Sequence, residues 1–106
     1  MMDADVLWGG TLLQVSFDVP GECISLTVSV LDNGITTEYL VVCTDVIEFC
    51  YVNGLPEKWN YAEVTEAHSN FDPVAGLWQF EALLWSDDAG IMIRCRQMSI
   101  ESVKVT

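Results

Sequence analysis

The clearest structural signal in the chain is the heptapeptide Ile24-Ser25-Leu26-Thr27-Val28-Ser29-Val30. Its apolar residues alternate strictly with hydroxyl side chains, and successive side chains of a β-strand point to opposite faces. One face of this segment is therefore expected to enter a core while the other meets water. Thr and β-branched residues also suit the pleated surface of a strand. The heptapeptide predicts a half-buried strand, and the rest of the chain is interpreted from it.

Similar alternation recurs on both sides of the heptapeptide, and turn residues separate the segments. Asn33-Gly34 is typical of a tight hairpin because both residues tolerate positive φ. Further strands are predicted at 11–18, 35–43, 46–52, 64–71, 77–85, 91–96 and 98–105. This spacing predicts an all-β fold, an antiparallel β-sandwich or a partly open barrel of seven or eight short strands. At most one short helical turn is expected, near 56–63, after Pro56.

The chain is short, apolar and strongly acidic. Its 106 residues leave room for one core, so 1–106 is predicted to be a single all-β domain. The 51% hydrophobic content favours folding, and the formal net charge is −12. Only four cations offset the acids, namely Lys58, Arg94, Arg96 and Lys104. Nucleic acid and anionic membrane surfaces are excluded as partners, because both require clustered Lys and Arg. The acidity either keeps an apolar chain soluble or steers it toward a basic partner.

Location and cysteine chemistry are inferred together. The start of the chain is acidic, whereas a secretory signal needs a cationic head before an apolar stretch. A cytoplasmic location is therefore expected, and Cys23, Cys43, Cys50 and Cys95 are predicted to be free thiols. No pair has Cys-x-x-Cys spacing, and each thiol lies in an apolar strand-like run. All four are predicted to be core residues.

No catalytic or metal centre is readable in the sequence. His68 is the only histidine, and no nucleophile motif accompanies it, so a surface or half-buried role is favoured over catalysis. Asp87-Asp88 lacks the spaced oxygen ligands of a calcium loop, so a solvated hairpin tip is favoured over a metal site. The glycine-rich fingerprints of phosphate and dinucleotide sites are absent. We therefore expect no catalytic residue, no metal and no cofactor.

Tryptophans supply the candidate binding residues. Exposed indole rings stack on sugars and anchor protein interfaces, whereas buried ones only fill a core. Trp78 and Trp85 fall on opposite faces of one predicted strand, so one of them points away from the main core. The predicted binding residues are the aromatic Trp59, Tyr61 and Trp85, together with the acidic Asp87 and Asp88.

The layout resembles that of a known group of proteins. It is carried by the opening stretch 7–13, by Ser16-Phe17-Asp18, by Trp59-Asn60-Tyr61, and by the hairpin from Phe80–Trp85 into Ile91, Ile93 and Cys95. In these features the chain resembles small bacterial all-β proteins, some of them uncharacterised and some similar to immunity proteins of polymorphic toxin systems. The resemblance implies a cytoplasmic, non-enzymatic binding protein and carries over no catalytic residue.

Three functional hypotheses follow. The first is a non-enzymatic acidic protein that binds a protein partner, such as an immunity-type inhibitor covering the basic site of a toxin. The second is a β-sandwich that binds a carbohydrate or another small ligand through surface tryptophans. The third is a homo-oligomeric structural subunit, because a mean hydropathy of +0.31 is high for a monomer.

Overall fold

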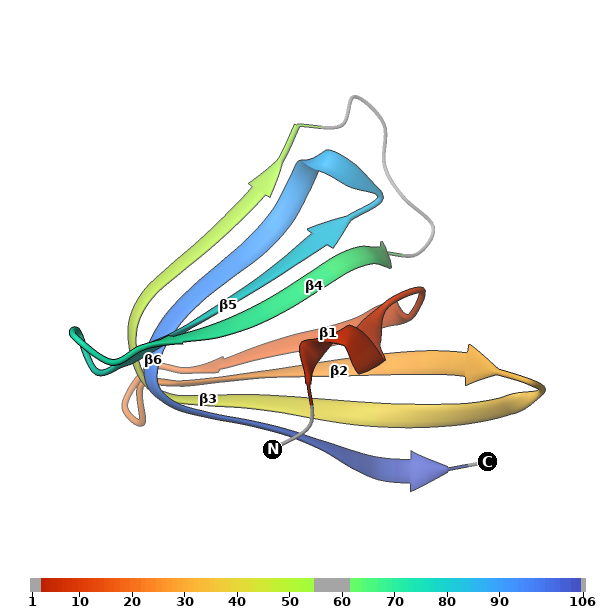
Figure 1. Cartoon of the computed structure of the whole chain (residues 1–106), viewed down its shortest axis with the longest axis horizontal. Helices are drawn as coiled ribbons and strands as arrows, with labels where there is room; N and C mark the ends of the chain where they lie inside the picture. Colours follow the sequence, from red (N-terminus) through yellow and green to blue (C-terminus); the bar gives the residue numbers. More distant parts are fainter. Residues whose placement is uncertain (1–2, 55–61, 106) are drawn as a thin grey trace.

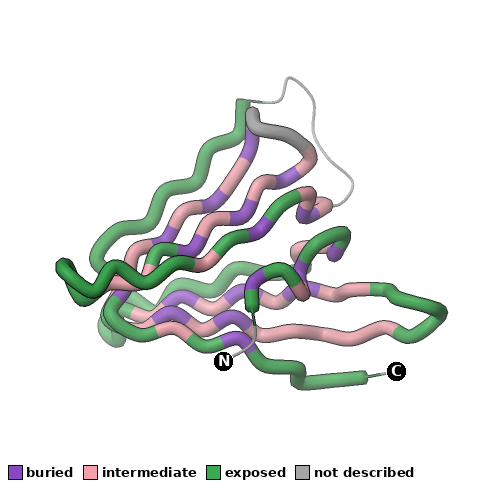
Figure 2. Tube along the Cα trace, viewed as in Figure 1, coloured by how far each residue is buried: buried purple, intermediate pink, exposed green. Residues whose placement is uncertain are grey.

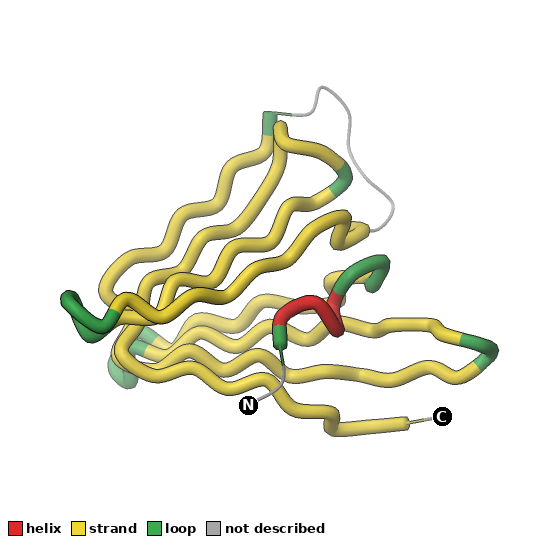
Figure 3. The backbone as a smooth tube through the Cα atoms, in the orientation of Figure 1, coloured by secondary structure: helices red, strands yellow, loops and turns green. Residues whose placement is uncertain are grey.

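The structure is a computed structural model that describes residues 3–54 and 62–105 of the chain. Strands make up most of these residues, and one turn of 3-10 helix precedes them (Figures 1 and 3). In chain order the elements are η1 (Ala4–Leu7), β1 (Thr11–Asp18), β2 (Cys23–Asp32), β3 (Ile35–Asn53), β4 (Ala62–Asp72), β5 (Leu77–Leu84) and β6 (Ser86–Val105). The predicted all-β fold class is confirmed.

The strands form one antiparallel sheet in the order β1-β2-β3-β6-β5-β4, which closes on itself as a barrel. The closure is short, because β1 pairs with β4 only through Thr11 with Glu63 and Leu12 with Ala62. The ladder between β3 and β6, in contrast, extends over nearly the whole length of both strands. The barrel is therefore continuous along β3 and β6 and weakly closed between β1 and β4.

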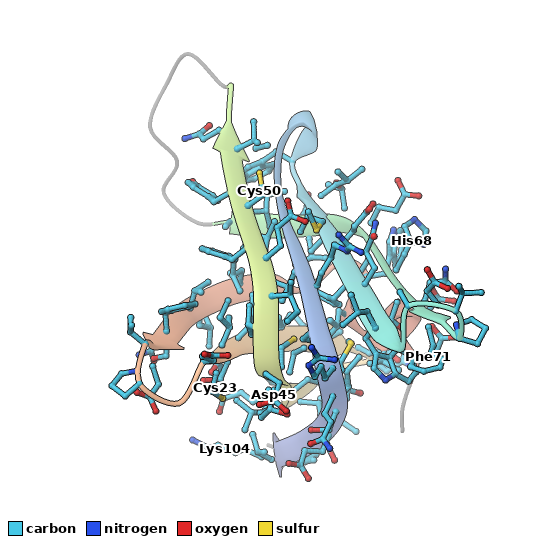
Figure 4. The ribbon with its side chains drawn as sticks, turned by 90° about the vertical axis from the view of Figure 1, so that its left-hand side faces the viewer. Cys23, Asp45, Cys50, His68, Phe71 and Lys104 are labelled. Carbon is cyan, nitrogen blue, oxygen red and sulfur yellow. The ribbon has the colours of Figure 1, made fainter. Side chains whose placement is uncertain are left out.

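The sheet is folded into two layers that meet at one end (Figure 1). Strands β3 and β6 run through both layers. Figure 1 shows them bending together at one end, where Thr44 pairs with Gln97. Before the bend, β3 lies beside β2, and after it only β6 pairs with β3 among the described strands. Asp45 lies at this bend (Figure 4) and has a φ of 53°, a conformation that Asp tolerates better than most residues.

The described residues contain six strands, fewer than the seven or eight short strands expected. The stretches 35–43 and 46–52 are one strand, β3, and the stretches 91–96 and 98–105 belong to β6. Register shifts between Val46 and Glu48 let the β3–β6 ladder bend without ending. Most of the helical turn expected near 56–63 lies outside the described residues, and Ala62 and Glu63 belong to β4.

One hydrophobic cluster fills the space between the two layers. Figure 2 shows buried positions alternating with partly exposed ones along the strands. The buried members are Ala4, Leu7, Ile24, Leu26, Val28, Val41, Cys43, Val64, Ala67, Phe80, Ala82, Leu84, Ala89, Ile91, Ile93, Cys95 and Ile100. The heptapeptide at 24–30 behaves as predicted, because its apolar side chains face this core and its hydroxyl side chains do not.

The 3-10 turn η1 was not predicted from the sequence. The side chain of Asp3 caps it by accepting a hydrogen bond from the amide of Asp5 at 3.1 Å. Ala4 and Leu7 are buried, which fixes the turn against the core. Two backbone hydrogen bonds with Val64, from Gly9 N at 2.8 Å and to Gly10 O at 2.7 Å, attach the following residues to β4. Residues 3–10 are therefore an integral part of the barrel.

Among the described residues, no helix has the length and apolar character needed to cross a membrane.

Candidate functional site

The five predicted binding residues are only partly described. Trp59 and Tyr61 lie outside the described residues. Asp87 and Asp88 fall within β6, and their side chains lie outside the described part of the structure. Trp85 is half-buried, connects β5 to β6 with a φ of 71°, and donates its amide hydrogen to the carbonyl oxygen of Glu63 at 2.9 Å. The structure therefore leaves the predicted group of five untested.

A large cavity lies elsewhere, between η1 and the hairpin formed by β2 and β3. It has a volume of about 730 Å³. One wall consists of Asp5, Val6 and Trp8. The opposite wall includes Val30, Asp32, Ile35 and Tyr39. We call this cavity the acidic cleft.

The hairpin wall of the acidic cleft continues the core-facing surface of the sheet. Val30 and Asp32 follow the buried Val28 at intervals of two residues along β2, so all three share one face. Across the ladder, Thr37 pairs with Val30 and Ile35 pairs with Asp32. The hairpin extends past the end of the barrel (Figure 1), and this inner face is left uncovered there except by η1. The uncovered face therefore presents apolar Val30 and Ile35 together with polar Thr37 and Asp32.

The electrostatic character of the acidic cleft is uniform. Asp5 and Asp32 are both exposed, and no Lys, Arg or His is among the described residues that line the cavity. Lys104 lies near a carboxylate elsewhere, 4.0 Å from Glu38, and no ion pair of the described residues includes Asp5 or Asp32. A cationic group entering the cleft would therefore meet two unneutralised carboxylates beside apolar surface.

Trp8 provides an aromatic surface at the mouth of the acidic cleft. Its side chain is 69% exposed, which is unusual for the largest apolar side chain in proteins. Tryptophan is the ring that most favours a cation above its face, and it is enriched at the energetic centres of protein interfaces. The combination of Trp8, Asp5 and Asp32 thus suits a cation attached to an apolar body, such as an Arg or Lys side chain.

Sequence reasoning did not identify the acidic cleft. Trp8 stood out only as a tryptophan in a turn-rich segment, and Asp32 only as part of a hairpin turn. Their proximity depends on how far the β2–β3 hairpin extends past the barrel and on where η1 packs. The one available signal was Asp3, a good helix N-cap two residues before Asp5.

His68 is on an exposed position of β4. Its Nε2 atom lies 2.5 Å from Oε1 of Glu66, two residues earlier on the same strand. Figure 4 shows His68 well separated from the labelled Cys23 and Cys50. Among the described residues, no group of three or more His, Cys, Asp or Glu side chains could hold a metal ion.

All four cysteines are free thiols, and they lie in three environments. Cys43 and Cys95 are buried in the core, as predicted, and Cys23 is half-buried. Cys50 is exposed, so the prediction of a core position is wrong for it. It lies on β3 beyond the bend, between Phe49 and Tyr51, whose positions face the interior, so its own side chain points outward.

The two buried thiols interact. A hydrogen bond to Cys95, together with burial, raises the pKa of Cys43 far above its usual range. The same hydrogen bond lowers the pKa of Cys95. Cys43 is therefore the donor of the pair and keeps its proton. The protonated Cys43 thiol is a poor nucleophile, and both side chains are buried, so the contact is part of the packed core.

Comparisons with known proteins bear on the fold alone. No protein-family model matches the sequence, and no curated protein matches it. A solved structure with a similar fold is the crystal structure of an uncharacterized protein from Neisseria gonorrhoeae. The TM-score is 0.71, the sequence identity is 11%, and the alignment covers 91% of this chain and 93% of that chain. The barrel is thus shared along nearly the whole length of both proteins.

Proposed function

We propose that the chain is a non-enzymatic binding protein for a basic protein partner, and that the acidic cleft receives a Lys or Arg side chain of that partner. An immunity-type inhibitor of a basic toxin is the specific form of this role that the sequence resemblance supports. The observation that carries the proposal is the acidic cleft itself, where Asp5 and Asp32 flank apolar surface beside the exposed Trp8.

The overall charge supports the same partner. The chain carries 16 acidic and four basic residues. Arg94 and Lys104 already lie 3.4 Å and 4.0 Å from Glu48 and Glu38, so they leave the excess negative charge of the surface unbalanced. Long-range attraction of this kind raises association rates with a basic protein and weakens as salt screens it.

The proposal is tested first with a minimal probe. Arginine amide is titrated into isotopically labelled protein and followed by NMR, with the uncharged norleucine amide as the matched probe. We expect the amides of Asp5 and Asp32 and the indole N–H of Trp8 to shift with arginine amide only. The double variant Asp5→Asn/Asp32→Asn should lose these shifts. The control variant Glu81→Gln/Glu101→Gln removes the same charge elsewhere and should keep them.

A second experiment addresses the partner. The immobilised protein and the same two double variants are used to isolate partners from cells, and the affinity of a purified partner is measured at low and high salt. Affinity should fall as salt rises, and it should fall further in Asp5→Asn/Asp32→Asn than in the control variant. Equal affinities for the two variants, or no salt dependence, would refute the proposal.

A carbohydrate-binding role is the second candidate, and the exposure of Trp8 favours it. An indole ring can stack on a sugar while Asp5 and Asp32 accept hydrogen bonds from its hydroxyl groups. Tryptophan fluorescence across a panel of glycans distinguishes the two functions. A saturable change with one glycan, unaffected by salt, would favour this candidate over the basic partner.

A further inference from the structure

Strand β1 has apolar side chains that face the barrel interior without being buried there. Val15 pairs with the buried Leu26. Phe17 pairs with the buried Ile24. Side chains of directly paired residues lie on the same face of a sheet, so Val15 and Phe17 point inward. Both nevertheless remain at least 38% exposed, so nothing among the described residues covers them fully.

The second half of β3 also has side chains that face the interior and remain exposed. Phe49 pairs with the buried Ile93. Tyr51 pairs with the buried Ile91. Phe49 and Tyr51 therefore face the interior, yet they are 40% and 52% exposed. Among the described strands, none closes the barrel wall between this part of β3 and β1.

The two strands present unpaired edges at this opening. Pairing of β1 with β4 ends at Leu12, so residues 13–18 pair only with β2 among the described strands. Pairing of β3 with β2 ends at Cys43, so residues 47–52 pair only with β6. The rings of Phe17 and Phe49 approach to 6.2 Å between their centroids, so these two edges border one gap. We call it the β1–β3 opening.

An apolar cavity lies in the β1–β3 opening. Its volume is about 330 Å³, and it is lined by Leu12, Val15, Phe49, Tyr51 and Ile91. Apart from the Tyr51 hydroxyl, these side chains offer no hydrogen-bonding group. The occupant that suits such a site supplies apolar side chains to the cavity and backbone groups to the strand edge. An extended polypeptide segment does both, since alternate side chains enter the pocket while its main chain pairs with the sheet.

Acidic residues mark one end of the β1–β3 opening. There the amide of Val46 donates to the carbonyl oxygen of Glu22 at 2.9 Å, which brings the β1–β2 turn against β3. The exposed residues Asp18 and Glu22 flank the β1–β2 turn, and the exposed Asp45 directly precedes Val46. No ion pair of the described residues includes these three carboxylates. A second copy of the chain would bring the same negative charges to the edge and be repelled. A segment with cations at one end would be attracted.

From these observations we propose that the β1–β3 opening binds an extended segment of a basic partner protein. The segment pairs with the edge of β3 at residues 47–52, where only β6 pairs with β3 among the described strands. Its alternate apolar side chains enter the cavity, and its Lys or Arg residues lie beside Asp18, Glu22 and Asp45. This inference rests on the proposed function, because it takes the basic partner from there and adds a second surface on which that partner is held.

The test uses a synthetic nonapeptide with Val or Ile at alternate positions, Thr between them and two lysines at one end. Binding to the intact protein is measured by calorimetry and by NMR. We expect saturable binding that weakens by about tenfold or more in Val15→Lys, which places a charge in the cavity. Val74→Lys makes the same substitution at a position that is 96% exposed in the β4–β5 turn, and it should leave the affinity unchanged.

Two further measurements distinguish a loss of peptide binding from unfolding of the variant. Peptide saturation should slow hydrogen exchange of wild-type amides within 47–52, and a peptide N-methylated along one edge should not bind. Absence of peptide binding, equal affinity in Val15→Lys, or dimerisation of the wild-type chain through this edge in sedimentation would each overturn the inference. Asp5 and Asp32 take no part in this test, so failure of the acidic cleft and failure of the β1–β3 opening are separate outcomes.

Discussion

Strands β1 and β2 are neighbours with similar alternation of apolar and polar residues, yet only β2 is buried. The inward side chains of Ile24, Leu26 and Val28 on β2 have almost no accessible surface, while those of β1 beyond Leu12 are exposed. Strand β2 has β1 on one side and β3 on the other, and η1 contacts it. Strand β1 has a described neighbour on both sides only at Thr11 and Leu12. Alternation therefore reports the direction of a side chain, and the neighbouring elements decide whether it is covered.

The same contrast occurs within the single strand β3. Before the bend at Asp45, Cys43 is buried between β2 and β6. After the bend, Cys50 lies on the part of β3 that pairs with β6 alone, and it is exposed. Figure 4 shows Cys50 on this part of β3, away from Asp45 at the bend. One strand thus serves both as core and as an edge.

The largest expected effect is on thiol reactivity. In native protein, Cys50 should react with an aromatic disulfide reagent about a thousandfold or more faster than Cys43, since a core thiol reacts only when the structure opens. The hydrogen bond to Cys95, which raises the pKa of Cys43, adds to this protection by keeping the thiol protonated. Mass spectrometry of the modified peptides over time measures both rates. Comparable rates would show that Cys43 and Cys50, and so the two parts of β3, do not differ in burial.

A second prediction compares the stability contributions of β1 and β2. Leu26 is 1% exposed and Leu13 is 54% exposed, so the same substitution samples a core site and an open one. Leu26→Ala should lower the free energy of unfolding by about 2–5 kcal/mol, because it removes buried methyl groups and leaves a cavity. Leu13→Ala should cost less than about 1 kcal/mol. Urea denaturation of both variants measures the difference, and equal losses would contradict the assigned burial.

The sequence predicted much of the barrel because most of its strands are locally encoded. The strand at 11–18 was predicted with the bounds of β1, and the alternating stretch at 24–30 lies within β2. The register shifts between strands, in contrast, could not be predicted from local alternation. Strict alternation would place Leu13 on the same face as Val15, but the register shift between Leu12 and Gln14 leaves Leu13 unmatched in the β1–β2 ladder, and that shift follows from pairing with β2.

The candidate sites were less predictable than the strands. The acidic cleft joins residues of η1 to the β2–β3 hairpin. The β1–β3 opening lies where the pairing of β1 with β4 and of β3 with β2 has ended among the described strands. Both features depend on strand order, which alternation does not contain. Trp59 and Tyr61 remain predictions, because they lie outside the described residues.

The smallest predicted effect concerns Gly10, which packs against Val28 and Val30 of β2. A Cβ added at Gly10 would lie 2.7 Å from Cγ1 of Val28 and 2.9 Å from Cγ2 of Val30, closer than packed carbon atoms approach. Gly10→Ala should therefore lower the free energy of unfolding by about 1–3 kcal/mol through overpacking. It should also weaken arginine amide binding, since displacement of η1 moves Asp5 and Trp8 at the acidic cleft.

A double-mutant cycle separates overpacking from a general loss of stability. Val28→Ala removes the Cγ1 atom that the new methyl group would meet. If the two side chains compete for one space, Gly10→Ala should cost less in the Val28→Ala background than in the wild-type protein. Additive losses in the cycle would mean that Val28 does not oppose the new methyl group, and that its close packing against Gly10 does not distinguish the covered strand from the open one.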